Sequence, residues 1–170
     1  MPTILTHAVL GAAIAQVLAP PSFRRTLTWV CAGCAMLPDA DVVGFGLGVA
    51  YGDMLGHRGI THSVLFAGLA GLSTLGWFRQ STAALCVFLA TVSHGLLDAL
   101  TNGGLGVAFF APFSAARYFF PVTPIPVSPI GARFFSARGV GVLVSEVLWV
   151  WLPVIVILLA ARFRPRHAPP

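Results

Sequence analysis

The sequence predicts an all-α fold: a polytopic membrane helical bundle of about five apolar helices, formed by residues 1–170 as a single domain. Hydrophobic residues make up 57% of the chain and charged residues only 9%, whereas soluble domains carry about 25% charged residues. All ten basic residues are arginines, and they stand mostly at the ends of apolar runs, as in membrane proteins. We therefore expect the lipid bilayer, and no nucleic acid, as the partner of this basic chain.

The first two predicted helices are short. Residues 3–19 form the first, which Pro20 and Pro21 end, and residues 26–37 form the second. About 20 residues are needed to cross a hydrocarbon core of ~30 Å, so we expect these helices to thin the bilayer or to pack as an inner hairpin. The first apolar run lacks a preceding basic region and a clear cleavage site, so we expect a retained helix.

Three more apolar runs follow a Gly-rich loop at residues 43–52: residues 62–78, residues 81–100 and residues from about 140 to 161. Between the last two runs, residues 105–138 are rich in Phe and Pro. Proline removes backbone donors, so this segment does not suit a spanning helix, yet it is too apolar for a solvated linker. We expect it to lie at the membrane interface and to cover part of the polar residues described next.

The arginines predict how the helices cross the membrane. Cytoplasmic loops are rich in basic residues, which places the following on the cytoplasmic side: Arg24, Arg25, Arg79, Arg162, Arg164 and Arg166. Five crossings satisfy this placement, with the C-terminus in the cytoplasm, although four arginines then lie outside: Arg58, Arg117, Arg133 and Arg138. The same topology gathers all five carboxylates, and every histidine except His167, at the outer, periplasmic face of the inner membrane. We therefore expect a common site at that face.

Two motifs combine ligand types that metals prefer. His94-x-x-x-Asp98 places an imidazole and a carboxylate four residues apart, on one face of a helix. This pair suits Zn²⁺, and also Mn²⁺ or Fe²⁺; a buried histidine bonded to a helical neighbour is the alternative. Pro38-Asp39-x-Asp41 sets two carboxylates at a helix end, where a turn that needs Asp is the alternative.

A third cluster lies at residues 57–63, where two histidines and an arginine occur together. His57 and His62 are five residues apart, about 140° around a helix, so both cannot face one point from a regular helix. We expect one to bind from the loop and the other from the start of the helix. The guanidinium of Arg58 would hold a phosphate or pair with a carboxylate. Its candidate partners are Asp39, Asp41 and Asp53.

These clusters together predict a metal site. Unpaired carboxylates at one depth of a membrane would be costly, whereas a divalent ion would offset their charge. The candidate ligands are His7, Asp39, His57, His62, His94 and Asp98. A single catalytic zinc takes fewer ligands, so we expect one or two ions, with Asp39 or Asp98 bridging a pair. The candidate catalytic residues are Asp41, as a general base or an orienter of a ligating histidine, and Arg58, which with Arg117 would hold phosphate oxygens.

The order of these motifs resembles a known family. The pieces are Thr6-His7, Pro38-Asp39-x-Asp41, His57-Arg58-Gly59-x-Thr61-His62-Ser63 and His94-x-x-x-Asp98-x-x-Thr101, followed by Ala111-Pro112-Phe113-Ser114 and Pro126-Val127-Ser128-Pro129. Over most of the chain they resemble the YdjM-like family of LexA-regulated, inner-membrane, metal-dependent hydrolases. A more distant similarity is to zinc-dependent phospholipase C and related zinc nucleases, which implies an α-helical fold with a metal cluster at helix ends.

The distant similarity also implies a ligand set. The first metal would take Asp39, His62, His94 and Asp98. A second would take His7 and share a carboxylate. Those relatives have a further set of histidine and glutamate ligands. In this chain the histidines of that set are missing, and only Glu146 could take the place of the glutamate.

The leading hypothesis is a membrane-bound hydrolase that uses metal-activated water, with Zn²⁺ as the expected ion, on a phosphoester of a lipid or lipid-linked substrate. Residues 105–138 would guide an acyl chain. The alternative is a non-catalytic membrane protein, either a metal-binding protein or a structural helical bundle. Transport is disfavoured because mid-helix positions carry no polar residue beyond Ser, Thr, Cys and Gln16. The oligomeric state stays open.

Overall fold

The computed structural model describes residues 1–129 and 134–163. Within these ranges the regular elements are helices, and the β-type contacts are two isolated bridges. In chain order the elements are α1 (Ile4–Leu18), α2 (Arg24–Met36), the 3₁₀ turn η1 (Leu37–Val42), α3 (Val43–Gly46), the 3₁₀ turn η2 (Ile60–His62), α4 (Val64–Phe78), α5 (Ser81–Ala99), α6 (Ala137–Glu146), the π-helical turn η4 (Val147–Trp151) and α7 (Leu152–Arg162). The last three run on as one long helix. The all-α prediction is confirmed.

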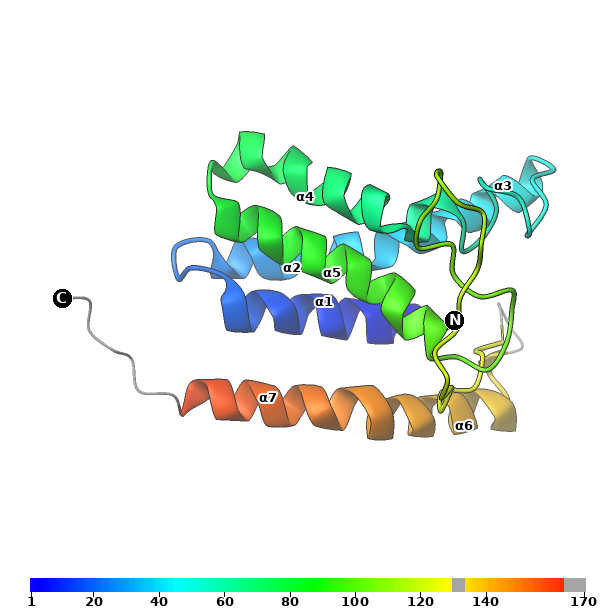
Figure 1. Ribbon diagram of the computed structural model, residues 1–170. Helices are drawn as coiled ribbons and strands as arrows, with labels where there is room; N and C mark the ends of the chain where they lie inside the picture. Colours follow the sequence, from blue (N-terminus) through cyan, green and yellow to red (C-terminus); the bar gives the residue numbers. More distant parts are fainter. Residues whose placement is uncertain (130–133, 164–170) are drawn as a thin grey trace.

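The helices α1, α2, α4 and α5 form a bundle, and the long C-terminal helix lies along one side of it (Figure 1). The buried core between α1, α2 and α5 is made largely of small side chains, including Ala15, Cys31, Ala35 and Cys86. At Gly11 a Cβ atom would lie 2.5 Å from the carbonyl oxygen of Cys31. Small residues let membrane helices approach closely, so α1 and α2 pack as a tight hairpin.

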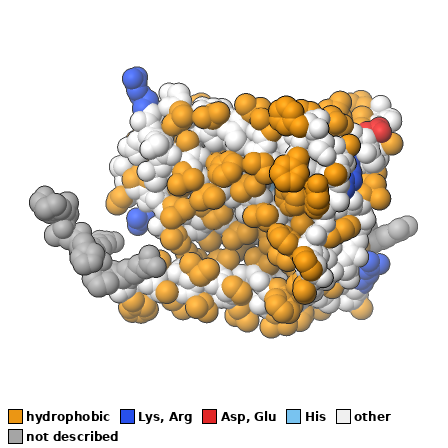
Figure 2. Space-filling view, in the orientation of Figure 1, with side chains coloured by type: hydrophobic (Ala, Val, Ile, Leu, Met, Phe, Trp, Pro, Cys, Tyr) orange, Lys and Arg blue, Asp and Glu red, His pale blue; other side chains and the backbone are white. Residues whose placement is uncertain are grey.

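The surface of the bundle is apolar. Among the described residues, two helices are long and apolar enough to cross a membrane: Ser81–Ala99, and Ala137–Arg162 with a mean hydropathy of 2.5. Two shorter helices, α1 and α4, are apolar and 15 residues long. The C-terminal helix exposes large side chains such as Leu148, Trp149 and Val156. Figure 2 shows hydrophobic side chains spread across the visible face of the helices. This surface suits contact with lipid and agrees with the predicted membrane bundle.

The polar motifs lie at one end of the bundle. Helices α1, α4 and α6 begin at this end, and α2 and α5 finish there, beside α3 and the segment after α5 (Figure 1). The turns between α1 and α2 and between α4 and α5 lie at the opposite end, together with Arg24 at the start of α2 and Arg79 after α4. The predicted gathering of ligand residues at one face of the bundle is therefore confirmed.

The helix predicted from residue 62 begins two residues later. Ser63 is the N-cap of α4, and its hydroxyl accepts a hydrogen bond from the backbone N–H of Phe66. Serine caps satisfy one of the free N–H groups at a helix start. His62 therefore lies in the turn η2, outside the α-helix, and the geometry of α4 does not constrain the direction of its side chain.

The Phe- and Pro-rich segment covers the site end of the bundle. Its first described part, residues 105–129, contains no regular helix. The backbone N–H groups of Phe120 and Ile125 donate to carbonyls at the end of α5, and Ile125 is fully buried. Residues 130–133 lie outside the described ranges, while residues 137–138 already belong to α6.

Candidate metal centre

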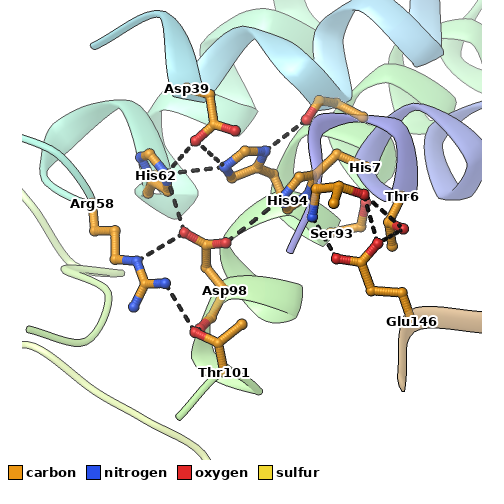
Figure 3. A network of polar contacts seen from close by, with 12 residues as sticks. Thr6, His7, Asp39, Arg58, His62, Ser93, His94, Asp98, Thr101 and Glu146 are labelled. Atoms are coloured by element: carbon orange, nitrogen blue, oxygen red, sulfur yellow. Dashed lines mark hydrogen bonds and ion pairs between the residues drawn. The ribbon is translucent and has the colours of Figure 1, made fainter. Parts of the chain in front are cut away.

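Four buried side chains form a candidate metal centre at this end of the bundle (Figure 3). Asp39 comes from η1, His62 from η2, and His94 and Asp98 from α5. Each offers one ligand atom, and these atoms all lie within 4.8 Å of one another. The structure thus brings together the four residues that the distant similarity implied as the first ligand set.

The ligand atoms are spaced like a small coordination shell. His62 Nε2 lies 3.0 Å from His94 Nε2 and 3.6 Å from Asp98 Oδ2. Asp39 Oδ1 lies 3.3 Å from His94 Nε2 and 3.9 Å from His62 Nε2. Ligand atoms at about 2.0–2.2 Å from a tetrahedral zinc are about 3.4 Å apart. The space that these atoms surround therefore has the size of one ion.

Hydrogen bonds behind the two imidazoles fix which ring nitrogens carry protons. His94 Nδ1 lies 2.7 Å from the carbonyl oxygen of Ala35, and because a carbonyl only accepts, this nitrogen is the donor. His62 Nδ1 lies 3.0 Å from the hydroxyl oxygen of Thr61 and 3.3 Å from Asp41 Oδ2. The Thr61 hydroxyl itself donates to Asp41, so His62 Nδ1 is a donor as well. Such outer partners are typical of metal-binding histidines.

When Nδ1 of a neutral imidazole donates, its Nε2 is an acceptor without a proton. The two Nε2 atoms lie 3.0 Å apart in a buried site, so in the neutral form of both rings two lone pairs face each other. Burial lowers the pKa of His62 to about 4, against the raising effect of its hydrogen bond with Asp41. The ring is therefore neutral near pH 7. A cation between the two nitrogens would remove this repulsion.

Several buried polar atoms at the centre have no hydrogen-bond partner among the described residues. They are both ring nitrogens of His7, both oxygens of Asp39, both oxygens of Asp98, and Nε of Arg58. Leaving a buried polar group unpaired costs about 1–3 kcal/mol, and most such groups are paired in native proteins. Arg58 Nε and Asp98 Oδ2 nevertheless form an ion pair. Carboxylate oxygens gathered around one point are the donor set that a divalent cation needs.

His7 stands beside the four-residue cluster, on the first turn of α1. Its ring stacks on that of His94, with the centroids 3.7 Å apart, and its Nε2 lies 3.6 Å from Asp98 Oδ1. The other oxygen of Asp98 faces His62. The Asp98 carboxylate therefore lies between His7 and His62.

His57 does not join the four-residue cluster; it forms a second group with Asp41 and His62. Asp41 Oδ1 lies 2.7 Å from His57 Nδ1. Burial alone would raise the pKa of the Asp41 carboxyl, but hydrogen bonds with His57, His62 and Thr61 hold it well below its ordinary value. Asp41 is thus an ionised carboxylate on the Nδ1 side of His62, away from the cluster.

Arg58 is buried, with 1% of its surface exposed, and its backbone has a left-handed φ of 63°. Its Nε lies 2.9 Å from Asp98 Oδ2. Its Nη1 donates to the carbonyl of Gly103 at 2.8 Å, and its Nη2 to the hydroxyl of Thr101 at 2.9 Å. A positive φ in a residue other than glycine is strained and needs support from its surroundings. Here the buried guanidinium supplies that support and lies against a candidate ligand.

The predicted acidic partners of Arg58 were wrong, because in the described part of the chain its ion pair forms with Asp98. Asp41 is engaged by His57, and Asp53 accepts a backbone N–H within its own loop. The left-handed backbone at Arg58 turns its side chain toward the end of α5. Local sequence does not reveal that direction.

Arg117, the second residue predicted to bind phosphate, donates to backbone carbonyls of the loop before η2. Its Nη1 lies 3.1 Å from the carbonyl oxygen of His57, and its Nη2 lies 3.1 Å from that of Asp53. The guanidinium therefore ties the segment after α5 to the loop that carries Arg58.

Sequence reasoning missed several groups that support the ligands. The hydroxyls of Thr61 and Thr101 bond to Asp41 and Arg58. Both threonines lie inside the motifs quoted above, so the sequence could have indicated them. The role of the Ala35 carbonyl could not be predicted from the sequence, since every residue has a backbone carbonyl.

Three comparisons bear on these findings. The family model described as "YdjM inner membrane protein" matches residues 1–168. The chain is also 41% identical over 160 residues to Inner membrane protein YbcI of Escherichia coli (strain K12), which covers 90% of this chain and 92% of that protein. No solved structure matches the chain significantly. The distant similarity to zinc-dependent phospholipase C therefore gains no support from these comparisons.

Proposed function

The chain belongs to the YdjM inner membrane protein family, and we propose that it is a membrane-bound, metal-dependent hydrolase. Its expected reaction is the cleavage of a phosphoester of a lipid or lipid-linked substrate by water. One observation carries the proposal: the Nε2 atoms of His62 and His94 face each other at 3.0 Å while their Nδ1 atoms are occupied by other partners. A divalent cation between the two nitrogens would make this arrangement favourable in a buried site.

The first ion would be held by Asp39, His62, His94 and Asp98, with His7 and the shared Asp98 carboxylate available for a second. Zinc is the expected metal because imidazole and carboxylate ligands suit it, and manganese and iron are the alternatives. When bound, such ions lower the pKa of a water molecule and polarise a phosphoryl oxygen.

Three further residues would support this chemistry. Asp41 accepts from Nδ1 of His62 and so keeps Nε2 available as a ligand atom, which favours the orienting role over that of a general base. His57 bonds to the other oxygen of Asp41 and would fix its direction, or bind an ion within the second group. Arg58 holds Asp98, and each of its Nη atoms carries a second hydrogen by which it would hold a phosphate oxygen.

A lipid-linked substrate fits the surroundings of the site. The centre lies at the end of an apolar bundle, under a segment that exposes Phe110, Phe113 and Phe119. Exposed aromatic side chains are typical of the membrane interface. They would contact the bilayer beside the site and guide an acyl chain toward it.

We place the site on the periplasmic face, with five crossings and the C-terminus in the cytoplasm. The arginines at the other end of the bundle support this orientation. A phosphatase reporter that is active only outside the cytoplasm should be inactive when fused to the C-terminus and active when inserted after Gly48. An active C-terminal fusion would contradict the orientation without affecting the metal site.

The decisive test is the metal content and activity of the full-length protein in detergent. We expect at least about one tightly bound divalent ion per chain, and hydrolysis of bis(p-nitrophenyl) phosphate or of phospholipid in mixed micelles. Chelation should abolish hydrolysis, and added zinc should restore it. Wild-type protein that holds less than about one ion per chain would end the proposal.

The ion pair between Arg58 and Asp98 favours a second candidate, a structural bundle without metal. In that case Arg58 would neutralise one carboxylate, and His62 and His94 would share a proton. Metal analysis separates the two candidates directly. A protein that binds metal but hydrolyses neither substrate would be the non-catalytic, metal-binding alternative.

A further inference from the structure

Glu146 is fully buried at the end of α6, in the first half of the long C-terminal helix. Its Oε1 accepts the backbone N–H of Thr3 at 2.5 Å, and its Oε2 accepts the hydroxyls of Thr3 and Thr6 at 2.5 and 2.6 Å. All three donors lie at the N-terminus of α1, on its N-cap Thr3 and on Thr6 of its first turn; Figure 3 shows Thr6 beside Glu146. A helix N-terminus favours a carboxylate because its first N–H groups lack partners and its dipole is positive.

The π-helical turn η4 brings a second side chain to the same place. Trp151 Nε1 donates to the hydroxyl oxygen of Thr6 at 2.8 Å. Glu146 and Trp151 are five residues apart, which would place them about 140° apart on an α-helix. The wider i→i+5 turn, a feature often found at functional sites, turns both toward α1. Trp149, between them, stays 60% exposed.

These contacts end beside the candidate metal centre. Thr6 directly precedes His7, whose ring stacks on His94 and lies 3.6 Å from Asp98. Neither ring nitrogen of His7 has a hydrogen-bond partner among the described residues. The position of the His7 ring therefore depends on the position of the first turn of α1. Glu146 fixes that turn through its hydrogen bonds with Thr3 and Thr6.

We propose that Glu146 is a positioning residue for the metal centre, which it serves by fixing the first turn of α1 and so setting His7 against Asp98. Trp151 assists through Thr6. The inference rests on the proposed metal site. It means that the C-terminal helix supports this site through hydrogen bonds, although it supplies no ligand to the ion. The third ligand set for which Glu146 was a candidate is not needed to explain this buried carboxylate, since its oxygens are already bonded.

The test is a zinc titration of the full-length protein in detergent, in competition with a chelator of known affinity. Glu146→Gln keeps the side-chain volume but sets an NH₂ group against hydrogen-bond donors, so it should weaken zinc binding by about ten- to hundredfold. Trp151→Phe keeps an aromatic ring and removes one hydrogen bond, so it should weaken zinc binding less. In a His7→Ala background neither change should weaken it further, since the effect passes through His7.

Two neighbouring changes are matched controls. Ser145→Ala removes a hydroxyl that donates within its own helix, to the carbonyl of Val142. Trp149→Phe alters an exposed tryptophan of the same turn. Both variants should bind zinc like the wild type.

The outcomes separate this inference from the function on which it rests. A purely structural Glu146 would lower the unfolding temperature and leave zinc affinity unchanged, and that result would overturn the inference alone. Equal weakening with and without His7 would overturn it too. If Glu146→Gln does not fold, the same comparison with Trp151→Phe decides. Wild-type protein that binds no divalent ion would overturn the proposed function as well.

Discussion

His94→Ala and Asp98→Asn are expected to weaken binding of the divalent ion by at least about a hundredfold. Four-ligand zinc sites bind with about 10–16 kcal/mol, so one ligand accounts for about 3 kcal/mol, which is a hundredfold in affinity. Both side chains are fully buried at the centre of the cluster, so a water molecule does not easily take the place of the missing ligand. Metal content after dialysis and competition with a chelator measure the loss, and hydrolysis should disappear with it.

Asp53→Asn is the matched control for Asp98→Asn. Asp53 is an exposed acid that accepts a backbone N–H in its own loop, so its loss should leave metal content and hydrolysis unchanged. The His94→Ala variant is the cleaner of the two ligand changes, because Asp98→Asn also removes the partner of Arg58. A His94→Ala protein that keeps its ion at wild-type affinity would show that the ion binds elsewhere.

Arg58→Met is expected to lower the free energy of unfolding by about 3–5 kcal/mol, the usual cost of removing one partner of a buried ion pair. Methionine fills much of the space but leaves the Asp98 carboxylate without a counter-charge. A bound ion would supply part of that charge, so the loss should be larger in chelated protein than in metal-loaded protein. Thermal and denaturant unfolding in detergent, with and without zinc, measure the difference.

Arg79→Met is a close control for this change. Arg79 also has a left-handed backbone, with φ of 50°, but it is exposed at the other end of the bundle. Its replacement should change stability by about 0.5 kcal/mol or less. If Arg58→Met and Arg79→Met cost the same, the buried pair with Asp98 contributes little, and Arg58 does not support a ligand in the way described above.

The residues of the candidate centre were predictable from the sequence because their chemistry is rare in this chain. The chain of 170 mostly apolar residues contains only five carboxylates and five histidines. A carboxylate inside or beside a bilayer is energetically costly, so its presence indicates a functional or structural role. Helical spacing placed His94 and Asp98 on one face, and Asp39 fell at a helix end. The arginines, a separate set, predicted that these residues meet at one end of the bundle.

Contacts between distant segments were less predictable. Arg58 had three candidate partners within 20 residues, yet it pairs with Asp98, 40 residues away, because a left-handed backbone directs its side chain there. Glu146 looked like a stand-in ligand until its oxygens were seen bonded to the first turn of α1. In both cases several pairings satisfy the same charge or hydrogen-bonding need, and only the fold selects one.

The sequence by itself determined the class of this protein: an apolar helical bundle with imidazoles and carboxylates at one end, since composition and helical period follow directly from residue type. The tertiary structure alone decided which nitrogen of each imidazole faces the centre. The carbonyl of Ala35 and the Asp41–Thr61 pair bind the Nδ1 atoms of His94 and His62. Hydrogen bonds are directional, so these contacts between separate segments leave the two Nε2 atoms facing each other.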